Sequence, residues 1–385
     1  MVDPRITSLA RTLVNYSCEA REGERILIEA IDVPHEITCE CIRLARAAGA
    51  SPFVALKSNQ VNRALMMTGT EDQWQRTADL ERLCMEQVHC YIAIRGYPNT
   101  SELSDVPSDS QRLYESTVGK RVHNEVRVKK TRWVVLRWPD PSMAQSAGMS
   151  TEAFEDFYFE VCTMDYARLE AALQPLRRRM EQTDRVRLHG PGDTDLTFSI
   201  RGIPAVPCSG HYNIPDGEIY TAPVRDSVNG TITFNAPTSF RGQRHEGVRL
   251  RFAEGKIIEA TSSAEKKLNE VLDADAGARY IGEFSIGVNP FITRPMNDAL
   301  FDEKISGSIH LTPGQAYETA FNGNVSQIHW DMVLLQTREA GGGEIYFDDE
   351  LIRKDGQFVA SDLACLNPDE LTTARAPDKC VETSN

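Results

Sequence analysis

The sequence predicts an α/β protein with two domains: an N-terminal doubly wound parallel sheet domain and a C-terminal, mainly antiparallel α+β domain carrying a metal site. The chain has 385 residues, more than the roughly 250–300 at which a single core stops growing. Its first half alternates short β-type runs with helical segments, which is typical of a parallel sheet. From about residue 185 it becomes a series of apolar/polar alternations between turns, which is typical of antiparallel strands.

The N-terminal half contains four apolar, β-branched runs that read as buried strands: 25–30, 51–56, 90–96 and 132–138. Helical segments are expected at 34–50 and 70–88, and a longer helix over roughly 151–182, with Ser150 or Thr151 as its N-cap. No GxGxxG follows the first strand, and "HGPGDTD" (189–195) reads as a turn. A dinucleotide-binding function is therefore not favoured.

The C-terminal half is predicted to be β-rich, with one clear helix. Segments such as "TDLTFSIRG", "NGTITFN" and "VRLRFAEGKIIEA" alternate apolar and polar residues, and only 263–274 has a clear helical pattern. The change in pattern places the boundary near residue 184. We therefore expect an N-terminal α/β domain over residues 1–184 and a C-terminal catalytic domain over residues 185–385.

Composition excludes several classes of function. The net charge is −14 and no Lys/Arg-rich stripe with interleaved aromatics occurs, so nucleic acid is not an expected partner. No segment approaches the roughly 20 apolar residues of a membrane helix, and the N-terminus lacks the apolar core of a signal peptide. A cytoplasmic protein without membrane association is expected. Nine cysteines without a CxxC do not favour a Cys₄ zinc site.

One short stretch, "NGNVSQIHWDMVL" (322–334), combines an imidazole and a carboxylate with apolar residues. In a strand, residues i and i+2 point the same way, so His329 and Asp331 would project together and Trp330 would face the other side. The pair could be an ordinary hydrogen-bonded pair of the core. It could also be part of a metal site, which would need further ligands.

Other candidate ligands also lie in the C-terminal half. Glu218 follows a Pro/Gly turn in "NIPDGEIYTAP", and Glu283 lies in the apolar "YIGEFSIGVNPFI", where a carboxylate is costly to bury without a cation or donors. His310 lies in an alternating strand, and Tyr317 follows a Pro-Gly turn. Each has a structural alternative: Glu283 could form turn hydrogen bonds, and His310 could be a satisfied core histidine.

The number of these groups favours two ions over one. A zinc-type site takes three or four protein ligands. Five carboxylate and imidazole groups, some able to bridge, suggest two ions roughly 3.5–4 Å apart, as in two-metal hydrolases. The long sequence separation from Glu218 to Asp331 means that only the fold could bring them together.

Several segments along nearly the whole chain resemble one family: "DPRITSLARTLVNYS", "GERILIEAIDVPHE", "NIPDGEIYTAPVRDSVNG", "GARYIGEFSIGVNPFITRPM", "LFDEKISGSIHLTPGQAYE" and "GGGEIYFDDELIRKDGQF". They are similar to the M29 family of metallo-aminopeptidases, the bacterial aminopeptidase S/T group. The resemblance fades only beyond about residue 368.

The resemblance implies a set of metal ligands that are all present: Glu218, Glu283, His310, Tyr317, His329 and Asp331. It implies two divalent ions per chain (Zn, Co, Mn or Mg), peptide substrates with a free N-terminus, and a homodimer. Within this set we expect Glu283 to bridge the ions. Tyr317 is expected either to touch an ion or to donate a hydrogen bond to the oxyanion.

Two other functions are compatible with the same fold. His310, His329 and Asp331 could form a two-histidine, one-carboxylate triad for a single Fe(II) in a ring-cleaving dioxygenase. The presence of both Glu218 and Glu283 favours the hydrolase. The chain could also be a non-catalytic peptide-binding protein that keeps the fold without the chemistry.

Overall fold

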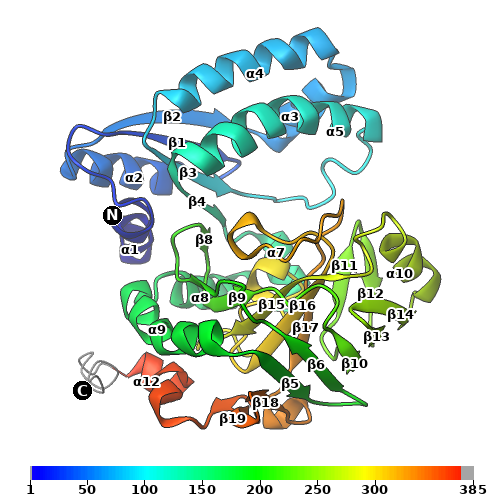
Figure 1. Cartoon of the computed structure of the whole chain (residues 1–385). Coiled ribbons are helices and arrows are strands. Elements are labelled where there is room, and N and C mark those ends of the chain that lie inside the picture. Colours follow the sequence, from blue (N-terminus) through cyan, green and yellow to red (C-terminus); the bar gives the residue numbers. More distant parts are fainter. Residues whose placement is uncertain (1, 374–385) are drawn as a thin grey trace. The chain divides into compact units, whose positions relative to one another are not determined.

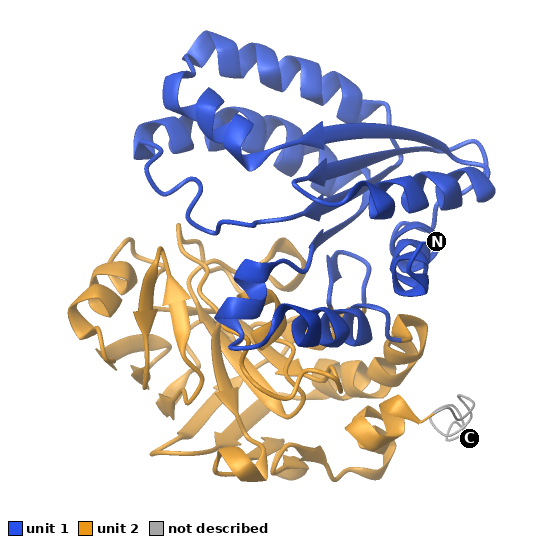
Figure 2. Ribbon diagram, turned by 180° about the vertical axis from the view of Figure 1, so that it is seen from behind, with its two compact units in different colours: residues 1–164, 210–215 blue, residues 165–209, 216–385 orange. Residues whose placement is uncertain are grey.

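The computed structural model describes residues 2–373, which form two compact units (Figure 2). Unit 1 comprises the residues up to Met164 and Gly210–Pro215, and unit 2 comprises Asp165–Ser209 and the residues from Asp216 on. The domains expected from the sequence, 1–184 and 185–385, divide the chain at another point and stay a prediction.

Unit 1 is built on a five-stranded parallel sheet with the order β2-β1-β3-β4-β8. Its strands are β1 (Arg25–Ile31), β2 (Ser51–Lys57), β3 (Cys90–Arg95), β4 (Arg132–Arg137) and β8 (Asn213–Ile214). The predicted strands of the N-terminal half are therefore all present. The parallel sheet confirms the predicted fold class.

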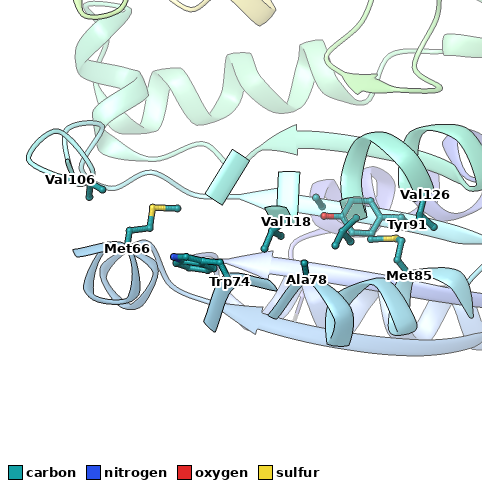
Figure 3. Packing of buried hydrophobic residues seen from close by; sticks show 10 residues of the cluster. Met66, Trp74, Ala78, Met85, Tyr91, Val106, Val118 and Val126 are labelled. Atoms are coloured by element: carbon teal, nitrogen blue, oxygen red, sulfur yellow. The ribbon is translucent and has the colours of Figure 1, made fainter. Parts of the chain in front are cut away.

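Helices cover both faces of this sheet, with α3, α4 and α5 on one face and α1 and α2 on the other (Figure 1). Their bounds are α1 (Pro4–Arg11), η1 (Thr12–Ser17), α2 (His35–Ala47), α3 (Asn59–Thr68), α4 (Glu71–Glu86), α5 (Ser108–Tyr114), η2 (Glu115–Arg127), α6 (Val128–Lys130), α7 (Pro141–Ser146) and α8 (Thr151–Cys162). On the first face, Trp74 of α4 and Val118 of η2 belong to one buried cluster with Tyr91 of β3 (Figure 3). Strand residues of the other parity, Ile92 and Ile94, are buried as well, so apolar side chains on both faces hold the helices in place.

Two predictions for this region were wrong. The run 51–56 forms a strand, but β2 lies at the sheet edge and much of it is exposed rather than buried. The single helix expected over 151–182 is two helices, α8 and α9 (Tyr166–Gln182). Asp165 accepts a hydrogen bond from the backbone N–H of Arg168 and caps the second helix, so a capping residue inside the helical pattern starts a new helix.

Unit 2 consists mainly of antiparallel strands, as predicted, in two sheets and one hairpin. The eight-stranded sheet has the order β14-β13-β10-β6-β5-β18-β19-β20, the five-stranded sheet β17-β16-β15-β9-β7, and the hairpin β11-β12. The strands are β5 (Arg185–His189), β6 (Asp195–Ser199), β7 (Val206–Cys208), β9 (Glu218–Thr221), β10 (Asn229–Thr233), β11 (Thr238–Phe240), β12 (Gln243–His245), β13 (Arg249–Ala253), β14 (Lys256–Thr261), β15 (Ile281–Gly287), β16 (Ser308–Pro313), β17 (Met332–Leu335), β18 (Glu344–Phe347), β19 (Glu350–Lys354) and β20 (Gln357–Phe358).

The helical elements of unit 2 are few and mostly short. Besides α9 they are α10 (Glu265–Leu272), α11 (Ala299–Asp302), η3 (Glu318–Ala320), η4 (Arg338–Ala340), η5 (Ser361–Leu366) and α12 (Pro368–Thr372). Helix α10 is the one expected over 263–274. Within residues 2–373 no helix is long and apolar enough to cross a membrane.

The two large sheets of unit 2 meet through apolar side chains. Phe284 of β15 packs edge-on against Phe198 of β6, with ring centroids 5.0 Å apart. Every residue of β15 is buried. Because strand residues alternate between faces, Glu283 and Ser285 must point to the opposite side from Phe284. One face of the five-stranded sheet thus packs in the core, and the other carries polar groups.

Candidate metal centre

The register of the five-stranded sheet collects the polar groups on one face. Ser285 of β15 pairs with Tyr220 of β9 on one side and His310 of β16 on the other. Glu283 pairs with Thr312 of β16. Directly paired residues share a face, so these five side chains point the same way. Glu218 lies two residues before Tyr220 in β9 and shares that face.

His329 and Asp331 reach the same face just before β17 begins. His329 forms an isolated bridge to Gly314, and the regular strand begins only at Met332. The expected alternation nevertheless holds: Trp330 stacks on Phe240, with ring centroids 4.9 Å apart, while His329 Nε2 lies 3.3 Å from Asp331 Oδ1.

Glu283 lies between the two histidines. Its Oε1 is 2.9 Å from His310 Nε2, and its Oε2 is 3.6 Å from His329 Nε2. Glu218 Oε2 is 3.5 Å from His310 Nδ1. Two groups of potential ligand atoms result, each with all atoms within 4.8 Å of one another: Glu218, Glu283 and His310, and Glu283, His329 and Asp331. Glu283 belongs to both groups.

Hydroxyl groups fix the orientation of the carboxylates of Glu218 and Asp331. Ser285 Oγ donates to Glu218 Oε2 over 2.8 Å, and Thr312 Oγ1 donates to Asp331 Oδ1 over 2.6 Å. Each hydroxyl binds one oxygen of its carboxylate and thereby restricts the rotation of the carboxylate group. Such partners behind the ligands commonly set the geometry and affinity of a metal site.

Backbone carbonyls orient the two imidazoles in the same way. His329 Nδ1 lies 2.9 Å from the carbonyl oxygen of Gln315, and His310 Nδ1 lies 3.3 Å from that of Glu303. A carbonyl only accepts, so Nδ1 carries the proton in both rings. In both rings Nε2 is then the nitrogen turned toward Glu283.

The electrostatics of the centre favour added positive charge. Burial opposes a charge on His310, but Glu218 and Glu283 outweigh it and raise its pKa to about 10. Burial likewise opposes a charge on His329, but Asp331 raises its pKa to about 9. Burial raises the pKa of Glu283, whereas His329 holds that of Asp331 well below its usual range against the effect of burial. The carboxylates thus attract protons onto both imidazoles.

These residues fit divalent cations. Glu283 Oε2 is buried and has no hydrogen-bond partner among residues 2–373, an arrangement that costs free energy unless a cation or donor is bound. Carboxylate oxygens and imidazole nitrogens are the ligands that zinc and neighbouring transition metals take. A divalent ion would replace the protons that the two histidines otherwise hold.

Tyr317, the remaining predicted ligand, lies beside the centre at the start of η3. Its ring is 4.7 Å from that of His329 and 5.7 Å from that of Tyr220. Burial, together with the charges of Glu283 and Asp331, raises its pKa, although 48% of the residue is exposed. Its role as a ligand stays a prediction.

Two charged residues of the centre were missed by the sequence analysis. Lys304, the second residue after α11, is 1% exposed; its Nζ lies 3.4 Å from Glu218 Oε1 and forms an ion pair with Glu303 Oε1. A carboxylate oxygen of Glu303 belongs to a third group, with His310 and Asp331. The charged "DEK" (302–304), a few residues before the strand that contains His310, was the available signal. It could not be interpreted without knowing which way the chain turns before β16.

The chain is similar to a set of bacterial metallopeptidases. The family model described as thermophilic metalloprotease (M29) matches residues 2–358. Aminopeptidase T of Thermus aquaticus is 29% identical over 225 residues, which cover 51% of this chain and 54% of that protein. Aminopeptidase AmpS of Bacillus subtilis is 27% identical over 247 residues, 56% of this chain and 59% of that protein. The chain thus spans about half the length of these two curated relatives.

Solved structures share the fold. Wild-type AmpT from Thermus thermophilus matches with a TM-score of 0.77 at 20% identity, covering 93% of this chain and 99% of that chain. A 2,5-dihydroxypyridine dioxygenase from Pseudomonas putida KT2440 matches with a TM-score of 0.60 at 13% identity, covering 93% and 98%. The match of the family model over nearly the whole chain decides between these two neighbours: the chain belongs to the M29 family of metallopeptidases.

Proposed function

We propose that the protein is a metal-dependent aminopeptidase that removes N-terminal residues from peptides with the help of two divalent ions. The observation that carries the proposal is the pair of ligand groups that share Glu283, since a shared carboxylate is the usual bridge of a two-ion site. The similarity in sequence to aminopeptidases T and AmpS supports the same activity. The metal would be Zn, Co, Mn or Mg.

In this proposal each residue has a distinct part. Glu218 and His310 would hold one ion, His329 and Asp331 the other, and Glu283 both. When bound, divalent ions lower the pKa of water and polarise a carbonyl group. Tyr317 would donate its hydroxyl hydrogen to the developing oxyanion. Ser285 and Thr312 would keep the carboxylates of Glu218 and Asp331 in place.

The mononuclear dioxygenase is less well supported. A two-histidine, one-carboxylate triad needs His310, His329 and Asp331 around one ion. Among the described residues, no group with all ligand atoms within 4.8 Å contains more than one histidine. Both histidines instead turn Nε2 toward Glu283.

Metal-stripped protein, reconstituted separately with Zn, Co, Mn, Mg and Fe(II), tests the activity. We expect hydrolysis of amino-acyl p-nitroanilides with one or more of the first four ions, no hydrolysis without metal, and little with the N-acetylated substrate. Elemental analysis should find two ions per chain. One iron with oxygen uptake on dihydroxypyridines would support the dioxygenase instead. Peptide binding without turnover under any metal would support the non-catalytic alternative.

The first variant prediction concerns the bridge. Glu283→Gln keeps the shape but removes the charge that offsets the repulsion between two ions, so this variant should retain at most one ion and lose nearly all hydrolysis. Glu218→Gln should lose affinity at one site only and recover part of its activity with excess metal. Calorimetric metal titration measures both. Two tightly bound ions in the Glu283 variant would contradict the bridging role.

The second variant prediction concerns Tyr317. If its hydroxyl stabilises the oxyanion, Tyr317→Phe should lower kcat by roughly 10²–10³, the range for one lost donor, with metal content unchanged. The same substitution at Tyr220, whose hydroxyl is 2.7 Å from Thr319 Oγ1, is the matched control and should have a much smaller effect. A large loss of metal from the Tyr317 variant would make Tyr317 mainly a ligand.

Stability should depend on pH in the metal-free protein. A histidine whose pKa is raised by folding stabilises the protein fully below its unfolded pKa of about 6.5, and this contribution is lost as pH rises through the folded value. With the pKa of His310 near 10 and that of His329 near 9, the free energy of unfolding should fall between about pH 6.5 and 10, by on the order of 3–5 kcal/mol per histidine at most. Thermal melts across this range would measure it.

Metal-loaded protein is the control for this pH effect. Bound ions replace the imidazole protons, so its stability should change much less over the same range. His329→Gln should weaken the slope of the metal-free protein. Equal slopes with and without metal would contradict the assignment of these histidines as ligands.

We also propose a homodimer that forms through unit 1. Large apolar side chains are exposed on β2, α3 and α4, namely Phe53, Val54, Leu56, Val61, Leu65, Met67, Leu80 and Leu83. An exposed apolar edge strand with neighbouring apolar helices is a surface that proteins usually cover. Leu56→Glu with Leu83→Glu should shift the protein to monomer in light scattering, whereas Val359→Glu, also at an exposed apolar position, should not. A monomeric wild-type protein would overturn this proposal.

A further inference from the structure

Glu303 is a carboxylate of the candidate metal centre that belongs to neither of the two ligand groups that share Glu283. One of its oxygens lies within 4.8 Å of a nitrogen of His310 and an oxygen of Asp331. Its side chain is 15% exposed, so it lies at the border of the buried centre. Glu303 therefore reaches the reacting region without being needed to complete either group of ligands.

Lys304 fixes the position of this carboxylate. The ammonium group of Lys304 pairs with Oε1 of Glu303 and is 3.4 Å from Oε1 of Glu218. At 1% exposure, Lys304 cannot exchange these partners for water. Because Lys304 contacts both Glu218 and Glu303, it fixes the distance between Glu303 and the proposed ligands.

The other titratable groups of the centre are engaged elsewhere. Both imidazoles have Nδ1 on a backbone carbonyl and Nε2 toward Glu283, so neither has a nitrogen left for a substrate. Glu218 and Asp331 each accept a hydroxyl hydrogen bond and are proposed terminal ligands. Amide hydrolysis still needs a group that moves a proton from the attacking water to the leaving amine.

We infer that Glu303 is this proton carrier and that Lys304 is its positioning residue. The inference rests on the proposed aminopeptidase function. As the water oxygen forms its bond to the scissile carbonyl carbon, the Glu303 carboxylate takes one proton from it. The C–N bond then breaks, and Glu303 returns the proton to the leaving nitrogen. The products are the free N-terminal amino acid and the shortened peptide, and no further reactant is consumed.

The test compares Glu303→Gln with wild-type protein and with Glu265→Gln, an exposed position on α10. In Glu303→Gln we expect kcat to fall by roughly 10²–10⁴, the usual contribution of a general acid–base group. KM and calorimetric metal binding should stay near the wild-type values, whereas the melting temperature should fall, because the buried Lys304 loses one of its two carboxylate partners. Formate should restore part of the activity of Glu303→Ala, because a small carboxylate can enter the space left and carry the proton. Glu303→Asp, which keeps the charge next to Lys304, should keep more activity than Glu303→Gln.

Other outcomes would overturn the inference in distinguishable ways. Loss of a metal ion from Glu303→Gln would make Glu303 a ligand. A raised KM with kcat retained, together with lost preference for substrates with a free amine over their des-amino analogues, would make it an amine-binding group. Unchanged kinetics, or no rescue by formate, would leave the carrier role to another group. Inactive wild-type protein under every metal would overturn the proposed function and this inference together.

Discussion

Mutual repulsion among buried carboxylates is the constraint on which the metal centre depends. Glu218, Glu283, Glu303 and Asp331 lie close together in a region with little solvent. Two like charges 4 Å apart repel by about 4 kcal/mol at an effective dielectric constant of 20. Lys304 supplies one compensating charge. The remaining negative charge is offset by protons on His310, His329 or Glu283, or by bound cations.

Packing on the apolar face of the same sheet keeps these carboxylates in place despite their repulsion. Phe284 alternates with Glu283 and Ser285 along β15 and packs against Phe198 in the other sheet. Moving Glu283 away from its neighbours would therefore disturb the core between the two sheets. The alternation visible in the sequence therefore has two effects: one face of the strand packs in the core, and the other carries the candidate metal ligands.

Much of this arrangement could be predicted from local patterns. Alternation placed His329 and Asp331 on one side of Trp330, and the cost of burial drew attention to Glu283 within an apolar run. The parallel sheet of unit 1 followed from strands separated by helices. These features depend on near neighbours in the chain, which is why the sequence alone was sufficient.

Features that depend on distant segments were not predictable. The exposed position of β2 follows from its place at the sheet edge, which strand order decides. The pairing of Glu283 with Thr312 depends on a register shift between Ile281 and Glu283, and nothing in the sequence marks that bulge. Lys304 and Glu303 join the centre because the chain turns back into β16 after α11. By sequence they are ordinary charged residues after a short helix.

A carboxylate that belongs to two ligand groups has a consequence for how the centre fills. If two ions bind as proposed, the first would orient Glu283 for the second and so favour its entry, while the charge of the first would oppose it. The two ions would then not load independently, and each would change the affinity for the other by the same factor, because such coupling is reciprocal. Where orientation outweighs repulsion, scarce metal would divide the population into empty and fully loaded chains, with few half-loaded ones. The loading curve would then measure cooperativity as much as affinity.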